Sequence, residues 1–138
     1  MTEYQKREIV GALPSGANVI GSVNEARGKT ILYDGDDVTN GTTTMRTVTA
    51  GKTYYLLMAG LAFYSSANGE EARIRIGGGT NFILRLASRI TPTYRTTDSD
   101  HSEVTFPHPI PVAAGVAISV TSTAAVLGAY GWIVGWEE

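Results

Sequence analysis

Lys52-Thr-Tyr-Tyr-Leu-Leu-Met-Ala-Gly-Leu-Ala-Phe-Tyr-Ser-Ser66 is the stretch that decides the fold of this 138-residue chain. It has no charged side chain after Lys52, and apolar side chains occupy both alternating sets of positions. Successive side chains of a strand point to opposite faces, so the pattern predicts a strand covered on both faces. A small antiparallel domain usually needs only one covered face. We therefore expect a partner subunit to cover the second, through Tyr54, Leu56 and Met58.

A helix is the alternative for this stretch, because Leu56-Leu-Met-Ala59 is a run of good helix formers. Gly60 interrupts that run, however, and the β-rich segment 42–49 leads into it. Turn residues lie on both sides, at 50–51 and 65–69. The sequence therefore favours a strand.

The composition excludes several classes of protein. Hydrophobic residues make up 43% of the chain and charged residues 17%, below the roughly 25% charged of an average soluble domain. The formal net charge is −2, so no basic footprint for nucleic acid is present. Without cysteine, neither a disulfide nor a thiolate nucleophile is available. The polar N-terminus does not resemble a signal peptide, and no apolar run reaches the about 18 residues of a membrane span. We expect a protein assembled inside a cell, with no membrane or nucleic-acid partner.

Strand and turn signals alternate along the rest of the chain. The expected short strands, besides the central stretch, are residues 30–33, 42–49, 71–76, 82–87, 103–106, 116–121 and 127–136. We expect Asp34-Gly-Asp-Asp37 to end the first strand, and 88–102 to form a long loop. Pro107-His-Pro-Ile-Pro111 cannot lie in the middle of a sheet, because proline donates no hydrogen bond. About eight strands predict one all-β antiparallel sandwich, jelly roll or barrel over residues 24–138.

The last strand has one large face and one small face. The large side chains are Tyr130, Trp132, Val134 and Trp136, and the small face holds Ala129, Gly131, Ile133 and Gly135. We expect the large face to fill the core and the small face to let another backbone come close. Exposed aromatic side chains on a β-sandwich would instead suit sugar binding. The candidates for that alternative are Tyr4, Tyr33, Tyr94, Trp132 and Trp136.

Residues 1–23 are predicted to form an extended N-terminal arm. The segment 9–23 mixes apolar residues with three glycines and a proline, and neither a helical nor a strand period survives. An arm that docks on a neighbour and a first edge strand with a Pro-Ser-Gly turn both fit this segment. The arm residues that we expect at a subunit contact are Ile9, Val10, Leu13, Val19 and Ile20.

No catalytic, cofactor or metal motif is recognisable. Asp98, Asp100, His101, Glu103 and His108 match no zinc spacing. The segment 34–37 lacks the remaining ligands of a calcium loop. The glycines at 77–79 precede a strand rather than the helix that a phosphate loop needs, and no Gly-x-Ser-x-Gly elbow exists. We therefore expect a protein that is not an enzyme and that holds no metal or cofactor.

Three segments together carry a resemblance to a known class of protein: residues 12–23, 106–120 and 131–138. In this combination the chain resembles the small jelly-roll, trimer-forming virion structural proteins of tailed bacteriophages. The resemblance implies a homotrimer that contacts the major capsid protein or another virion subunit. It implies a decoration (cement) protein on the head surface, assembled in the host cytoplasm. A tail or baseplate accessory, or a glycan- or receptor-binding module on the particle, is the alternative.

Overall fold

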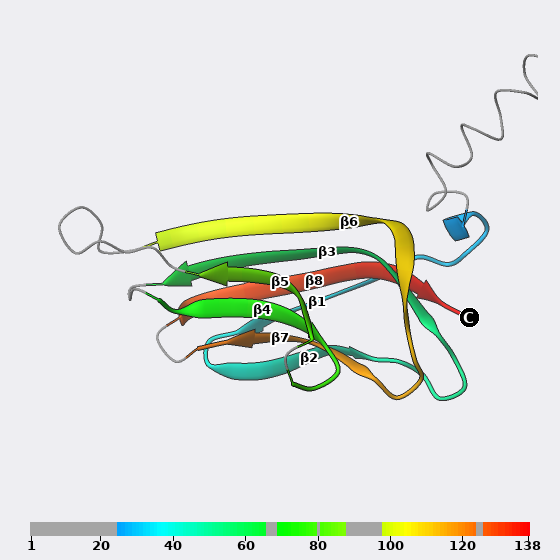
Figure 1. The fold of residues 1–138 in the computed structure, drawn as a ribbon, viewed down its shortest axis with the longest axis horizontal. Coiled ribbons are helices and arrows are strands. Elements are labelled where there is room, and N and C mark those ends of the chain that lie inside the picture. The colour runs from blue at the N-terminus through cyan, green and yellow to red at the C-terminus, as the bar shows by residue number, and fades with distance from the viewer. Residues whose placement is uncertain (1–24, 66–68, 80, 88–97, 124–125) are drawn as a thin grey trace, which may run out of the picture.

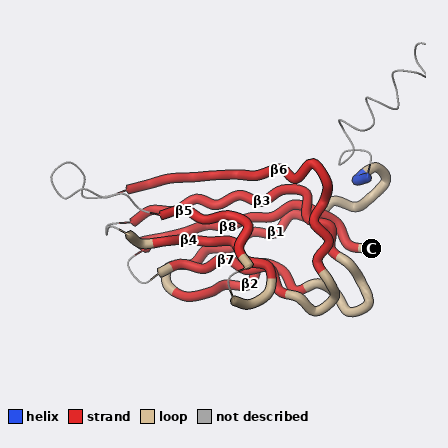
Figure 2. The backbone as a smooth tube through the Cα atoms, viewed as in Figure 1, coloured by secondary structure: helices blue, strands red, loops and turns tan. Residues whose placement is uncertain are grey.

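The computed structural model describes residues 25–65, 69–79, 81–87, 98–123 and 126–138. Within these ranges the chain forms eight strands, which run along the long axis of the molecule (Figures 1 and 2). They are β1 (Leu32–Val38), β2 (Gly41–Thr47), β3 (Tyr54–Ser65), β4 (Glu71–Ile76), β5 (Phe82–Ala87), β6 (Asp98–Val112), β7 (Ala117–Ser122) and β8 (Val126–Glu137). No helix in this described part is long and apolar enough to cross a membrane.

The strands form two four-stranded sheets with the orders β1-β8-β3-β6 and β2-β7-β4-β5. Every pairing is antiparallel, and β1·β8, β2·β7, β3·β6 and β4·β5 are nested pairs, as in one long hairpin that has been rolled up. This is the jelly-roll arrangement of a β-sandwich. The predicted all-β antiparallel fold of about eight strands is confirmed. The predicted arm, residues 1–23, lies outside the described residues.

The central strand β3 is apolar on both sets of positions because it contains a bulge. Its register shifts between Leu56 and Met58 against both of its neighbours. One extra residue reverses which set of side chains points inward. Before the bulge Tyr54 and Leu56 point into the core, both 0% exposed; after it the inward side chains are Ala59, Leu61 and Phe63. The expected partner contact of Tyr54 and Leu56 is wrong, since both pack inside their own subunit, whereas Met58 is half-buried.

The inward and outward faces of strand β8 are the reverse of the prediction. Its small face points into the core, where Ala129 and Ile133 belong to the buried cluster. A Cβ on Gly131 would lie 2.9 Å from the Cβ of Val120 in the opposite sheet, and a Cβ on Gly135 would lie 2.2 Å from the carbonyl oxygen of Tyr55. The interior therefore has no room for a side chain at Gly131 or Gly135, whereas Ile133 between them is accommodated in the core. The aromatic face points outward instead.

Two segments predicted as loops are strands. Asp34 to Asp37 lie within β1 and pair with β8, and residues 98–102 begin β6. The prolines of β6 are tolerated because β6 is an edge strand. Pro107 and Pro109 also fall in the irregular segment between Thr105 and Ile110, the two residues that pair with β3 on either side of the bulge.

A partly buried ion cluster ties the two sheets together beside the core. Arg46 of β2 donates from Nε and Nη2 to the two oxygens of Asp34 in β1, at 2.6 and 3.1 Å, and from Nη1 to Glu137 in β8 at 2.9 Å. The hydrogen bond to Asp34 raises the pKa of Arg46. Hydrogen bonds from Thr49 and then Arg46 lower the pKa of Glu137. The Arg46 guanidinium also lies 5.3 Å from the ring centre of Tyr54.

Glycine-to-alanine changes in β8 should reveal how tightly this strand is packed, against β3 of its own sheet at Gly135 and against the opposite sheet at Gly131. Gly135→Ala places a methyl group against backbone that cannot move aside, so we expect a loss of about 2 kcal/mol or more in the free energy of unfolding. Gly131→Ala meets side-chain atoms of Val120 and Met45 at 2.9 to 3.2 Å, and we expect a smaller loss. Urea unfolding measures both.

Gly128→Ala is the matched control, because a Cβ at Gly128 in the same strand meets nothing within 4 Å. It should change stability by no more than about 0.5 kcal/mol. Equal effects at Gly128 and Gly135 would contradict the proposed close approach.

Candidate binding surfaces

The outer face of the β1-β8-β3-β6 sheet carries rows of side chains that cross all four strands. The rows follow from the strand registers, because residues directly opposite one another share a face. One row consists of Gly35, Trp132, Gly60 and Glu103; the next consists of Asp37, Tyr130, Ala62 and His101. This face therefore combines aromatic rings, glycines and ionisable groups.

Trp132 and Tyr130 lean sideways onto glycines of the neighbouring strands. A Cβ on Gly60 would lie 2.0 to 2.2 Å from three indole atoms of Trp132, so the indole occupies the space that a side chain there would need. A Cβ on Gly35 would likewise lie 2.2 Å from the hydroxyl of Tyr130. Both rings can lie over the sheet only because these positions are glycine.

Tyr33 completes a continuous aromatic surface with these two rings. Its ring stacks on that of Trp132, with centroids 6.3 Å apart and planes at 21°. Its hydroxyl is 2.8 Å from that of Tyr130, and this hydrogen bond raises the pKa of Tyr130. Tyr33 is 59% exposed. We call Tyr33, Tyr130 and Trp132 the aromatic platform.

A hollow of about 420 Å³ adjoins the platform on the same sheet. Apolar and aromatic groups line it together with two acids and a histidine. The lining residues include Ala62, Tyr64, Tyr130, Asp37, Asp100 and His101. Tyr130 belongs to both the platform and the hollow, so the two features form one continuous surface.

Trp136 lies on the outer side of β8 but contributes little to that surface. It is only 3% exposed, and its ring stacks on Tyr55 with centroids 5.1 Å apart. Of the two tryptophans, Trp132 is the half-buried one. The expectation that both fill the core between the sheets is wrong, because the core side of β8 is its small face.

The histidines and acids considered for a metal site are dispersed. His101 and Glu103 share the outer face of β6, whereas His108 lies further along β6, with Nδ1 3.8 Å from Glu25. Asp34 is paired with Arg46. Across the described residues no three His, Cys, Asp or Glu side chains gather in a way that could hold a metal ion.

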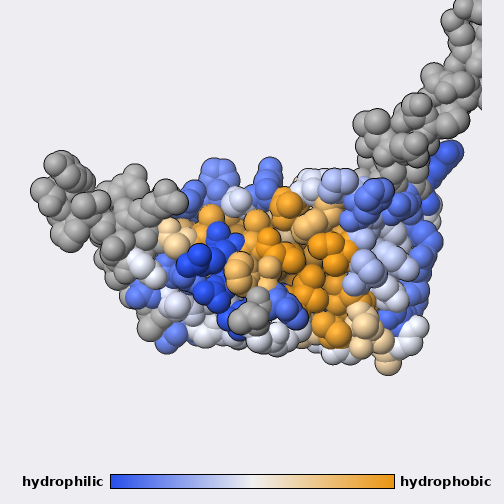
Figure 3. Space-filling view, viewed as in Figure 1, coloured by the Kyte–Doolittle hydropathy of each residue, from blue (hydrophilic) through white to orange (hydrophobic). Residues whose placement is uncertain are grey.

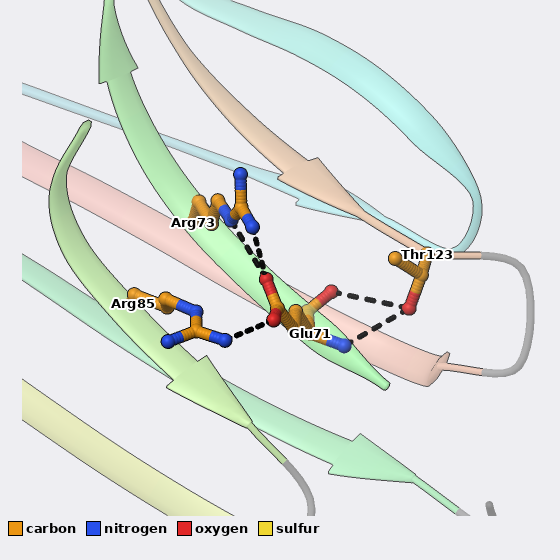
Figure 4. A network of polar contacts seen from close by, with 4 residues as sticks. All are labelled: Glu71, Arg73, Arg85 and Thr123. Atoms are coloured by element: carbon orange, nitrogen blue, oxygen red, sulfur yellow. Dashed lines mark hydrogen bonds and ion pairs between the residues drawn. The ribbon is translucent and has the colours of Figure 1, made fainter. Parts of the chain in front are cut away.

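The outer face of the β2-β7-β4-β5 sheet is polar and rich in arginine. The Glu71 carboxylate lies between Arg73 and Arg85, with Arg73 Nε donating to it at 2.8 Å (Figure 4). The backbone N–H of Glu71 donates to the hydroxyl of Thr123 at 2.9 Å. The hydrogen bond from Arg85, supported by that from Arg73, lowers the pKa of Glu71 to about 2.

Apolar side chains gather between the turn of the β4–β5 hairpin and the C-terminal part of β6 (Figure 3). The short strands β4 and β5 leave the longer β3 and β6 incompletely covered here. Partly buried apolar residues of β4, β5, β6 and the turn after β6 pack against the core, and we call this set the apolar patch: Ile76, Ile83, Leu84, Phe106, Ile110 and Val116.

Of the residues predicted at a subunit contact, Ile9, Val10, Leu13, Val19 and Ile20 lie outside the described residues. Neither the glycines beneath the platform nor the apolar patch is predicted from the sequence. A usable signal was present in β8, where Ala129, Gly131 and Gly135 alternate with aromatic residues. A strand face made of such small residues allows close packing, and here it packs against the core.

No protein-family model and no curated protein matches the chain. Among solved structures, a pentameric capsid protein from metagenomic phage sequences is similar, with 18% identity, 75% of this chain and 61% of that chain covered, and a TM-score of 0.49. The capsid of Helicobacter pylori bacteriophage KHP30 is 9% identical, with 79% of this chain and 93% of that chain covered and a TM-score of 0.48. The tumour necrosis factor Eiger from S. frugiperda is 13% identical, with 78% of this chain and 92% of that chain covered and a TM-score of 0.45.

Two of these three structures are of phage capsids. The chain spans less than two thirds of the pentameric capsid protein's length. At these identities and TM-scores the likeness extends to the arrangement of strands and not to function.

Replacing Glu71 should expose a pH-dependent contribution to stability. With its pKa lowered to about 2 in the folded protein from an ordinary 4.5, its contribution is complete above pH 4.5 and is lost as the pH falls towards 2. Glu71→Gln should therefore cost about 1 kcal/mol at pH 7, a modest value because the group is partly solvated. Urea unfolding at pH 7, 4 and 2.5 should show this difference shrinking.

Glu103→Gln is the control, since Glu103 is an exposed acid on the outer face of the other sheet. A Glu71→Gln deficit that stays constant from pH 7 to pH 2.5 would contradict the role of the carboxylate.

Proposed function

We propose that this chain is a non-enzymatic structural protein of a bacteriophage virion, which decorates the assembled head and stabilises it by bridging capsid subunits. The observation that carries the proposal is the apolar patch on a chain with 17% charged residues. Apolar area that a subunit leaves only partly covered favours association with another protein. The resemblance of segments 12–23, 106–120 and 131–138 to phage virion proteins is the reason for proposing a phage particle as the assembly.

The distribution of charge on the two sheets supports a role for the patch in association. Interface cores are depleted of charged residues and enriched in apolar and aromatic ones. The arginine cluster around Glu71 and the acids beside the platform lie on the outer faces of the sheets. The patch lies between them, at the side where β5 and β6 form the edges of their sheets. A neighbouring subunit can cover it without burying either charged face.

The N-terminal arm is proposed as the bridging element. Its apolar residues Ile9, Val10, Leu13, Val19 and Ile20 would cross to a neighbouring subunit, and Met58 would contribute from β3. A homotrimer bound to the major capsid protein is the proposed assembly. A position on the tail or baseplate is the alternative, and labelling of particles in electron micrographs distinguishes the two.

Deleting residues 1–23 should abolish binding to the particle while the sandwich still folds. We expect occupancy on heads that lack the protein to fall at least about tenfold, because permanent contacts depend on buried apolar area. Sedimentation of the particles followed by gel densitometry measures occupancy. Deletion of residues 1–8, which removes only the polar start, is the control and should bind like the full chain. Unchanged occupancy of the longer deletion would refute the bridging arm.

A charge placed in the apolar patch should also weaken particle binding. Val116→Lys adds an ammonium group where we propose that a neighbour packs, and the cost of burying it should lower occupancy at least about tenfold. Thr42→Lys, on the exposed outer side of β2, is the matched control. If both variants fold by circular dichroism and bind equally, the patch does not contact the particle.

A further inference from the structure

We propose that the aromatic platform and the adjoining hollow bind a neutral saccharide. The proposal rests on Tyr33, Tyr130 and Trp132, on the glycines that seat two of these rings, and on the acids around them. It does not depend on a place in a virion, so its failure would leave the proposed structural role intact.

The rings of the platform are held in place before any ligand arrives. Trp132 lies over Gly60 and stacks with Tyr33, and Tyr130 lies over Gly35 and hydrogen-bonds to Tyr33. Each ring is therefore fixed by at least two contacts. A surface that is rigid in the free protein loses little conformational entropy on binding.

The shape and chemistry of the surface match a sugar ring. A pyranose has an apolar face of C–H groups, which packs on an aromatic ring, and a rim of hydroxyl groups. Carboxylates accept hydrogen bonds from such hydroxyls, and a histidine can donate or accept. Asp37 and His101 share the row of Tyr130, and Glu103 shares the row of Trp132. Apolar area with a few converging polar groups is the usual composition of a ligand site.

The charges favour a neutral ligand. Among the described residues that line the hollow, Asp37 and Asp100 are acids and His101 is the one group able to carry positive charge. An acidic ligand would meet two carboxylates with little compensation. Arg73 and Arg85, which pair with Glu71, lie on the other sheet.

A protein partner is less well suited to this face than to the apolar patch. Docking a protein over the platform would remove water from the exposed acids Asp37, Asp100 and Glu103, and unpaired buried charge is costly. A saccharide keeps these carboxylates hydrogen-bonded through its hydroxyls. The hollow of about 420 Å³ is within the range of small-ligand pockets, roughly 300 to 1,000 Å³.

Calorimetric titration of the full chain tests the proposal. The probes are hexasaccharides of β-1,4-glucose, α-1,4-glucose, β-1,3-glucose, β-1,4-mannose, β-1,4-xylose and β-1,4-galactose, each up to about 10 mM. At least one should bind with a Kd of about 1 mM or tighter. Trp132→Ala should weaken that binding at least about tenfold, because it removes a stacking surface. Tyr33→Ala should weaken it in the same direction.

Phe82→Ala is the matched control, since Phe82 is a 44% exposed aromatic residue on the other sheet; it should leave the Kd unchanged. Gly60→Ala keeps the indole but displaces it, and should weaken binding as Trp132→Ala does. Near-ultraviolet circular dichroism verifies that each variant is folded. Absence of binding by all six probes, binding that survives Trp132→Ala, or a loss of capsid binding on Trp132→Ala without any saccharide binding would overturn the proposal.

Discussion

The close packing around the inward face of β8 is the constraint on which most of this structure depends. At Gly131 the space that a side chain would fill is occupied by Val120 of the opposite sheet, and at Gly135 by Tyr54 and the backbone of Tyr55 in the neighbouring strand β3. Ile133 packs inside between these glycines, and the aromatic residues of β8 point outward. The same packing thus places Tyr130 and Trp132 on the surface. The aromatic platform is a consequence of core geometry as well as a candidate site.

Electrostatic contacts complement this apolar packing at places where the sheets are not fully apolar. Arg46 reaches from β2 to carboxylates in β1 and β8, and so links strands of both sheets. Its pairing is bidentate with Asp34, the geometry in which a guanidinium binds a carboxylate most specifically. Glu71, in contrast, links β4 to the neighbouring strand β5 through Arg85, while Arg73 pairs with it from within β4. The first cluster fixes how the sheets face each other, and the second fixes the register of a hairpin.

The sequence predicted the fold class well because alternation and turn residues are local signals. The β4–β5 hairpin and the edge position of the prolines could be predicted from those signals alone. The inward face of β3 could not, because a bulge between Leu56 and Met58 reverses it and leaves no sign in the composition. The orientation of β8 was predicted wrongly for a related reason. Whether a large or a small face fills a core depends on how near the neighbouring strand and the opposite sheet lie, which is a property of the whole fold.

The candidate surfaces were harder to predict than the strands. Exposed aromatic residues were considered for sugar binding, but the glycines beneath the rings, Gly35 and Gly60, are far from Tyr130 and Trp132 in the sequence. Only the registers β1·β8 and β3·β8 bring them beneath the rings. The apolar patch likewise results from unequal strand lengths, since six-residue strands oppose strands of 12 and 15 residues.

The edge strand β6 has a consequence for aggregation. An exposed edge offers free N–H and C=O groups, to which a strand of another molecule can add and so begin a fibril. Pro107, Pro109 and Pro111 each remove one N–H from this edge, and the irregular segment 106–109 interrupts its line. Copies held close together could then associate through side chains without their sheets fusing into a continuous aggregate.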